Sequence, residues 1–234
     1  MARVVFAIFT VTLACSAQQP PQQSADRAVP AEPQQDKRLF GIIPNYRTSP
    51  SLVHYEPLTS KEKFKLANED ALDRGTFVLA AAFAGKDQLT NASPSFGQGV
   101  KGFAHYFVTS YADWAIGDYM TEAIWPSLLH QDPRYFRRGN GRALSRLTYA
   151  MSQIFVTHND SGHISFNFSE IGGNATTAAI SQAYHPDNRD AASAGSTFAV
   201  QIGVDMASNI MKEFYPDLRR ALSRKHRPAT SPTP

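Results

Sequence analysis

The chain has 234 residues, of which 42% are hydrophobic and 18% are charged; its formal net charge is +3 and its pI is near 9.0. This mildly basic balance is too weak to indicate nucleic-acid binding. The single cysteine, Cys15, lies close to the N-terminus, which excludes a disulfide framework, a cysteine-ligated metal and a cysteine nucleophile from the rest of the chain.

The N-terminus has the pattern of a signal peptide. Arg3 precedes an apolar run over residues 4–13 that is too short to span a bilayer, and small residues at 15–17 suit cleavage after Ala17. We therefore expect residues 1–17 to be removed and the protein to be exported, as a periplasmic or outer-membrane-associated protein. The alternative is a lipoprotein anchored through Cys15, although Thr12 departs from the usual lipobox.

Two segments lack the apolar side chains needed to offset the entropy of ordering. Residues 18–38 are rich in Gln and Pro and are predicted to be a disordered linker, and residues 221–234 are predicted to be a basic, Pro-rich disordered tail. Residues 39–220 remain, and they are long enough for a single domain with a substantial core.

The first half of this domain is predicted to be extended and then helical. Residues 39–55 are punctuated by proline and read as extended chain. Apolar periodicity and helix-boundary residues then predict the following helices: one with Ser60 as N-cap running to Asp73, a buried one over 76–84, a long one over 100–125 that ends before Pro126, and one that starts at Asp132-Pro133.

The second half is predicted to hold a short β element among helices. Ile164, Phe166 and Phe168 alternate with polar residues beyond a turn at 159–162, which predicts a β-hairpin or extended loop near 156–168. Helices are predicted over 142–155, 170–184 and 196–215, with Pro186 and Pro216 as stops. The expected fold is a mainly α bundle of about five or six helices whose small residues allow close packing.

Several stretches resemble a family of uncharacterised exported proteins of Gram-negative-type bacteria. The stretches are FGQGVKG at 96–102, HQDPRYFR at 130–137, DSG at 160–162, FNFSE at 166–170 and KEFYP at 212–216. The resemblance implies an envelope protein. It implies no activity and supplies no catalytic residue.

A polar stripe on two helices is the first candidate site. Glu170 and Asn174 share a helix face, and Gln201, Asp205 and Asn209 repeat the same four-residue spacing on an otherwise apolar helix. Buried carboxylates must find partners, so these residues predict a polar cavity with Glu170 or Asp205 as acid, base or metal ligand. The alternatives are a hydrogen-bond network that fixes helix register and a solvent-exposed face.

The long helix supplies a second set. His105 and Asp113 lie loosely on one side of it, and Asp118 and Glu122 share a face. A histidine beside carboxylates can perform acid–base chemistry. We therefore consider His105 together with Glu170 and Asp205 as weak catalytic candidates, against the alternative of an exposed histidine.

The turn of the hairpin is the third candidate. His158 and His163 would face each other across it with Asp160 nearby, and two histidines and an aspartate can bind zinc. The spacing matches no established metal motif, and a polar turn explains the same residues. We predict no metal site and no cofactor.

The fourth candidate is basic. Five arginines crowd thirteen residues among aromatic side chains, and guanidinium groups suit phosphate and carboxylate partners. This arginine cluster consists of Arg134, Arg137, Arg138, Arg142 and Arg146. The alternative is a solvated surface with ion pairs, yet the cluster is the strongest functional signal in the sequence.

These patterns lead to three functional hypotheses. The first is a non-enzymatic envelope protein that engages anionic lipid head groups, an envelope polymer or a protein partner through the arginine cluster, with no role for nucleic acid. The second is an envelope hydrolase acting on lipid or cell-wall material, with a polar pocket between helices. The third is a small helical bundle embedded in the membrane, which predicts an apolar belt flanked by Trp and Tyr.

Overall fold

The structure is a computed structural model that describes residues 37–49 and 55–225. This part of the chain is mainly helical with short strands, which confirms the predicted fold class. The predicted signal peptide, the linker up to residue 36 and the tail from residue 226 lie outside the described residues. The last helix continues to Lys225, so helical structure extends past the predicted domain boundary at residue 220.

The first two helices begin at well-formed caps. α1 spans Ser60–Ala71, and its N-cap is Thr59 instead of the predicted Ser60, because Thr59 and Glu62 form a reciprocal capping box. α2 spans Arg74–Leu89 and is capped by Asp73, whose Oδ1 accepts a hydrogen bond from the amide of Gly75 at 2.7 Å. The predicted helix over 76–84 is therefore the central part of a longer one.

The long helix does not end before Pro126, so that prediction is wrong. A 3-10 turn, η1 (Pro94–Phe96), precedes α3 (Gly99–Asp118), which passes into a π-helical segment, η2 (Tyr119–Ile124), and then into α4 (Trp125–Leu129). Pro126 is tolerated because it falls in the first turn after the π segment, where the regular hydrogen-bond ladder is already interrupted.

The predicted helix start at Asp132-Pro133 is also wrong. The chain there is extended, and β4 (Tyr135–Phe136) pairs in parallel with β3 (Thr48–Ser49). Asp132 caps a turn instead of a helix, since its Oδ1 accepts from the amide of Arg134 at 2.9 Å. The partner strand lies far away in sequence and was not visible in local patterns.

The other elements follow the prediction more closely. α5 spans Ala143–Ser152. The predicted hairpin is confirmed, with β5 (Val156–His158) antiparallel to β6 (Ile164–Phe166), and a second small hairpin joins β1 (Arg38–Leu39) to β2 (Ile43–Pro44).

The last two helices are α6 (Phe168–Ser181) and α7 (Ala191–Lys225). α7 continues through Pro216, so the predicted stop there is wrong. Glu213 and Asp217 lie on either side of this proline and both bond to Arg146, and these tertiary contacts hold the helix in place across the missing amide.

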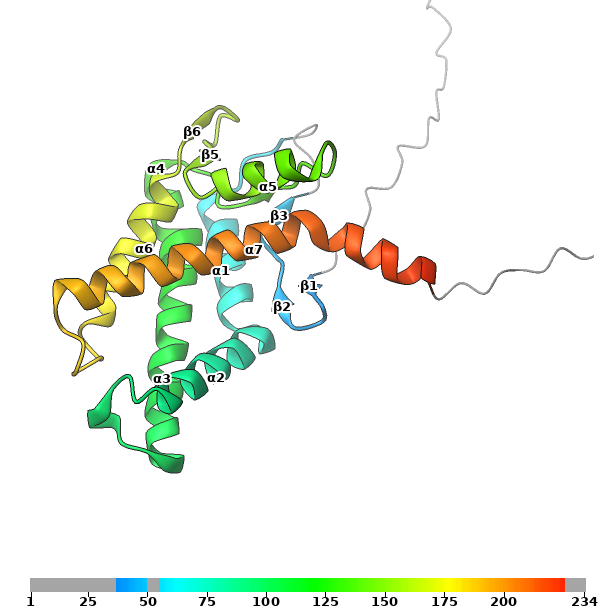
Figure 1. Cartoon of the computed structure of the whole chain (residues 1–234). Coiled ribbons are helices and arrows are strands. Elements are labelled where there is room, and N and C mark those ends of the chain that lie inside the picture. The colour runs from blue at the N-terminus through cyan, green and yellow to red at the C-terminus, as the bar shows by residue number, and fades with distance from the viewer. Residues whose placement is uncertain (1–36, 50–54, 226–234) are drawn as a thin grey trace, which may run out of the picture. The chain divides into compact units, whose positions relative to one another are not determined.

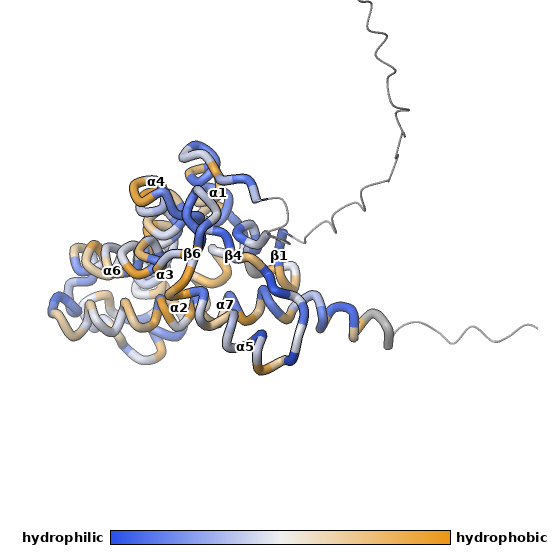
Figure 2. Tube along the Cα trace, turned by 90° about the horizontal axis from the view of Figure 1, so that it is seen from above, coloured by the Kyte–Doolittle hydropathy of each residue, from blue (hydrophilic) through white to orange (hydrophobic). Residues whose placement is uncertain are grey.

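The long α3–η2–α4 rod forms the centre of the described region (Figure 1). α2 packs along α3, α1 and α6 pack against η2, and α5 and α6 pack against α7. Apolar and polar residues alternate along α6 and α7 (Figure 2). Within the part of the chain that the structure describes, no helix combines the length and the apolar character needed to cross a membrane.

Buried alanines and polar side chains make up much of the interior. Ala67, Ala71, Ala80 and Ala84 are almost fully buried on α1 and α2, while charged residues such as Glu122 and Glu213 are 1% and 0% exposed. Buried charge is costly unless it is paired or protonated. The polar interior is therefore the natural place to look for function.

Candidate functional site

A close approach of α6 to the π segment brings the first polar residues together. A Cβ on Gly173 would lie 2.8–3.0 Å from the side chain and backbone of Thr121, so only glycine fits at this crossing. Glu170 and Asn174 flank Gly173 on α6, and Glu122 follows Thr121 on η2. The small residue thus sets the distance between the acidic side chains of the two helices.

Arg47, from the segment before β3, enters between these acids. Its Nη2 lies 3.1 Å from Glu170 Oε2, and its Nε lies 3.5 Å from Glu122 Oε1 and donates to the carbonyl oxygen of Pro133 at 3.1 Å. Arg47 therefore ties the N-terminal extended segment to both helices. Glu122 and Glu170 are 1% and 4% exposed, so both ion pairs are shielded from solvent.

The acids outnumber the bases in this interior. We define the buried charge cluster as Arg47, Asp70, Asp118, Glu122, Glu170, Asp205 and Lys212, which interact electrostatically with one another. Burial raises the pKa of Asp118, Glu122 and Asp205 well above the usual range, and neighbouring acids add to the effect. The cluster therefore holds protons at a pH where ordinary carboxyl groups are ionised.

Asp70 and Glu122 show this directly. Asp70 Oδ1 and Glu122 Oε2 are buried and have no hydrogen-bond donor among the described residues. Burial raises the pKa of Asp70 as well, and the two carboxyl groups lie close enough to interact through a hydrogen bond. A proton shared between them is the simplest way to satisfy both oxygens.

The predicted polar stripe is largely brought together. The amide nitrogen of Asn174 donates to the carbonyl oxygen of Glu170 at 3.1 Å and to Asp205 Oδ2 at 3.0 Å, which links α6 to α7. Gln201 lies on the same cavity wall as Asp205, whereas Asn209 lies at a smaller cavity of about 20 Å³ beside Arg47 and Glu170.

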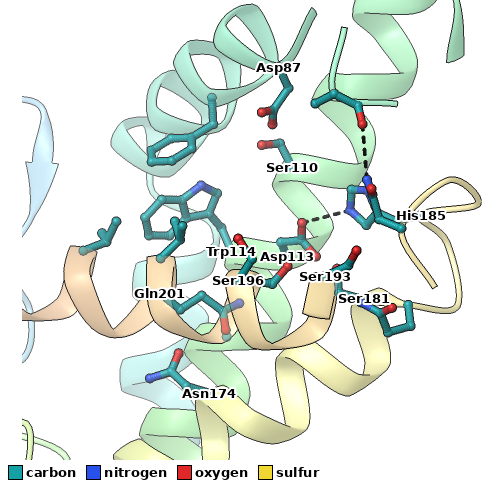
Figure 3. A pocket seen from close by; sticks show the side chains of 18 of the residues that line it. Asp87, Ser110, Asp113, Trp114, Asn174, Ser181, His185, Ser193, Ser196 and Gln201 are labelled. Atoms are coloured by element: carbon teal, nitrogen blue, oxygen red, sulfur yellow. Dashed lines mark hydrogen bonds and ion pairs between the residues drawn. The ribbon is translucent and has the colours of Figure 1, made fainter. Parts of the chain in front are cut away.

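The cluster borders a larger cavity of about 340 Å³, which we call the interhelical cavity. Residues spaced three or four apart on α3 form one wall: Ser110, Asp113, Trp114, Gly117, Asp118 and, on η2, Thr121. α2 contributes Phe83, Lys86 and Asp87, and α6 and α7 form the opposite side (Figure 3). Asp118, Asn174 and Asp205 belong both to this lining and to the polar interior.

Other acids of the cavity wall are already engaged. Asp113 accepts from the hydroxyl of Tyr184 at 2.5 Å. Its carboxyl group also lies 3.0 Å from His185 Nε2 (Figure 3). Asp87 pairs with Lys86 at 2.5 Å. The Phe83 and Trp114 rings meet edge to face with centroids 5.5 Å apart and give the cavity an aromatic wall.

His105 does not reach this region. It is exposed on α3 and its ring contacts Phe96 at 5.5 Å, so it does not converge with Glu170 and Asp205. The histidine that approaches Asp113 is His185, which lies beyond the end of α6. A helical projection could not find it, because the pairing spans 72 residues.

The hairpin residues do not form a metal site. His158 lies opposite Ile164, not His163, so the expected facing of the two histidines is wrong by one register position. His158 is buried against the ring of Phe136, and Asp160 pairs with Lys63 at 2.8 Å. Within the described residues, no group of three potential His, Cys, Asp or Glu ligands could hold a metal ion.

The arginine cluster divides into engaged and exposed members. Arg146 donates to Glu213 Oε1 at 2.7 Å, Arg137 donates to the Glu213 carbonyl oxygen at 2.9 Å, and Arg134 pairs with Asp132 at 2.7 Å. Arg138 and Arg142 are exposed. The anionic-surface hypothesis therefore stays a prediction that rests on two of its five arginines.

Glu213 is the hub of this second polar region. It also accepts from the hydroxyl of Tyr135 at 2.8 Å and from the amides of Arg138 and Gly139 at 3.0 and 2.8 Å. Although burial alone would raise the pKa of Glu213, the hydrogen bonds from Arg146 and Tyr135 hold that pKa below its usual range. We call this arrangement the Glu213 site.

The sequence reasoning missed Arg47, Asp70, His185, Lys212 and Glu213. A charged residue on a predicted apolar face is a usable signal for the last two, since Lys212 and Glu213 follow Ile210 on the same helix. Arg47 and His185 lie in irregular segments with no periodicity to mark them.

Comparison with protein families, with curated proteins and with solved structures finds no match for this chain. The resemblance to exported envelope proteins thus stays a prediction.

Proposed function

We propose that the chain binds a small polar organic molecule in the interhelical cavity. The observation that carries the proposal is a cavity of about 340 Å³ whose wall includes Asp118 and Asp205, two carboxyl groups with strongly raised pKa. Ligand pockets commonly measure about 300–1,000 Å³, and titratable groups with perturbed pKa concentrate at functional sites.

The contrast with purely structural polar groups supports this proposal. At the Glu213 site each carboxylate oxygen accepts at least one hydrogen bond. At the cavity, Asp118 has no hydrogen-bond or ion-pair partner among the described residues, and Gln201 Oε1 is buried without a donor. Buried polar groups are nearly always hydrogen-bonded in folded proteins, and a ligand that supplies donors at the cavity would satisfy these.

A second candidate is acid–base catalysis on the bound molecule, the hydrolase-like alternative of the sequence reasoning. The contact of Asp113 with His185 at the cavity wall favours it, because a carboxylate can orient an imidazole for proton transfer. Hydrolysis of chromogenic ester, amide and glycoside substrates by the wild type, abolished in His185→Gln, would support this activity. Activity that survives in His185→Gln would remove His185 from the mechanism.

A blocked cavity provides the test of ligand binding. Ser110 is buried and lines the cavity, so Ser110→Phe places a ring inside it, whereas Val108→Phe places the same ring on the exposed face of the same helix. We expect thermal-shift screening of small ammonium, hydroxyl and carboxylate compounds to stabilise the wild type and Val108→Phe but not Ser110→Phe. Equal shifts in both variants, or no shift in any protein, would contradict binding at this cavity.

A further inference from the structure

If all of its carboxyl groups were ionised, the interhelical cavity would carry unbalanced negative charge. Four carboxyl groups line it: Asp87, Asp113, Asp118 and Asp205. Lys86 pairs with Asp87, and His185 contacts Asp113. Among the described residues, neither Asp118 nor Asp205 has a cationic side chain in ion-pair contact. These two acids are therefore the ones left for a ligand.

The unpartnered hydrogen-bond acceptors of the cavity indicate the same kind of ligand as its charges do. Gln182 Oε1 and Gln201 Oε1, both from cavity-lining residues, are buried acceptors without a donor in the described chain. The amide nitrogen of Asn174 already donates to Asp205 and to the carbonyl oxygen of Glu170. These glutamine oxygens, together with an ionised carboxyl group, are acceptors that a ligand with several N–H donors satisfies.

The buried charge cluster behind the wall cannot supply the missing charge. Arg47 and Lys212 face five acids, and Arg47 is already in contact with Glu122 and Glu170. The cluster must therefore be neutralised by protons or by a cation from outside. A bare metal ion is a poor fit, since the cavity is about 340 Å³ and the described residues offer no metal-ligand group of three.

The aromatic wall of the cavity indicates that the ligand also has a carbon skeleton. Trp114 lies one helical turn before Asp118 on α3, so its ring and the Asp118 carboxyl group line the same side of the cavity. Phe83 lies against Trp114 from α2. Aromatic faces attract organic cations and pack against their carbon skeletons.

We propose that the ligand of the interhelical cavity is an organic ammonium ion, bound by Asp118 and Asp205 with its carbon skeleton against Trp114 and Phe83. This proposal rests on the proposed binding function and names its ligand class. Burial raises the pKa of both carboxyl groups, so both hold a proton without ligand, and one of them ionises to balance the single positive charge when the ammonium ion binds. Binding then releases a proton to solvent and strengthens as pH rises.

The test compares head groups on fixed skeletons. The probes are phenethylammonium, 2-phenylethanol and phenylacetate, and n-hexylammonium, 1-hexanol and hexanoate, titrated calorimetrically into the full chain. We expect the ammonium member of at least one series to bind about tenfold or more tightly than its neutral and anionic counterparts. Titration in two buffers of different ionisation enthalpy should show protons released on binding.

Two variants and a matched control locate the effect. Asp118→Asn and Asp205→Asn keep the shape of the protonated side chain and remove the charge the ammonium ion induces, so we expect each to weaken ammonium binding about tenfold or more and to leave alcohol binding unchanged. Asp87→Asn makes the same chemical change at an acid already paired with Lys86, and it should weaken ammonium binding less than about threefold.

The outcomes separate the two proposals. If alcohols or carboxylates bind as tightly as the ammonium probes, the ammonium assignment is wrong while ligand binding at the cavity stands. If no head group on either skeleton binds, both proposals fail. If Asp87→Asn weakens ammonium binding as much as Asp118→Asn does, the cation is attracted by the overall negative charge of the cavity lining and not by Asp118 in particular.

Discussion

Two acids of this chain, the buried Glu213 and the half-buried Asp118, are in opposite situations. Glu213 accepts from Tyr135, from Arg146 and from two backbone amides, and the pKa of its carboxyl group is lowered. Asp118 faces a cavity without a hydrogen-bond partner among the described residues, and the pKa of its carboxyl group is strongly raised. Both lie in a bundle rich in buried polar side chains, but only the first is completed by the protein itself.

Glu213 belongs to the polar groups that hold the fold, whereas Asp118 belongs to those for which we propose a ligand as the missing partner. A fully bonded carboxylate such as Glu213 fixes α7 against α5 and β4, so its removal takes away one of the two carboxylate partners of the buried Arg146 guanidinium. An unbonded acid such as Asp118 adds nothing to the fold when protonated. Replacing Glu213 by its neutral amide should therefore destabilise the fold, whereas the same change at Asp118 should not.

The largest expected effect is at the Glu213 site. Glu213→Gln removes one of the two carboxylates that pair with Arg146, and because Asp217 remains we expect it to lower the free energy of unfolding by about 1.5–3 kcal/mol. Urea unfolding followed by circular dichroism measures this. A loss below about 1 kcal/mol would show that the hydrogen bonds to Glu213 are replaceable and would remove one side of the comparison.

The next effect is at the helix crossing. Gly173→Ala places a methyl group against the backbone of Thr121, and overpacking of this kind typically costs about 1–3 kcal/mol. Because Asn174 and Glu170 flank this glycine, the change should also weaken ammonium binding at the cavity. Gly195→Ala, at a position with open space around the added Cβ, is the control and should do neither.

The cavity acids and the Glu213 site are expected to change the stability of the fold with pH in opposite directions. The pKa of Asp118, Glu122 and Asp205 is raised in the folded state, so stability present below about pH 4 is lost as pH rises through the folded pKa. The pKa of Glu213 and Asp217 is lowered, so stability present above about pH 4 is lost as pH falls through the folded pKa.

Unfolding free energies measured across pH 3–8 should therefore peak in mildly acidic solution. We expect Asp118→Asn to flatten the decline between about pH 5 and 8 and Glu213→Gln to flatten the decline below about pH 4. A stability that rises steadily from pH 5 to 8 in the wild type would contradict the protonated state of the cavity acids.

The smallest effect concerns the arginine cluster. Arg138 and Arg142 are exposed, so replacing both by Ala should change the unfolding free energy by less than about 0.5 kcal/mol. Co-sedimentation with anionic vesicles over a salt series tests the surface hypothesis, and we expect any salt-sensitive binding to disappear in this double variant. Binding that the double variant retains would place the surface elsewhere.

Local patterns predicted the helices and the hairpin but not the polar interior. Periodicity located α1, α5 and α6 to within a few residues, because each helix shows its own apolar face. Pro126 and Pro216 misled the prediction, since a π segment and the contacts of Glu213 and Asp217 keep the helices continuous there.

Only part of the site could be predicted from the sequence, and the reason is the same. Glu170, Asn174 and Asp205 share regular helical spacing and were found, whereas Arg47 reaches Glu170 across 123 residues and His185 reaches Asp113 across 72. Contacts of that range depend on how helices cross, and the crossing here depends on Gly173, whose role is visible only beside Thr121.

The most direct measurement compares Asp118→Asn with Glu213→Gln in urea, with and without phenethylammonium. We predict that Asp118→Asn unfolds at a urea concentration equal to or above that of the wild type and is not stabilised by the amine. Glu213→Gln should be strongly destabilised and yet be stabilised by the amine. If Asp118→Asn loses as much stability as Glu213→Gln, or is stabilised by the amine as much as the wild type, the distinction between the two acids is wrong.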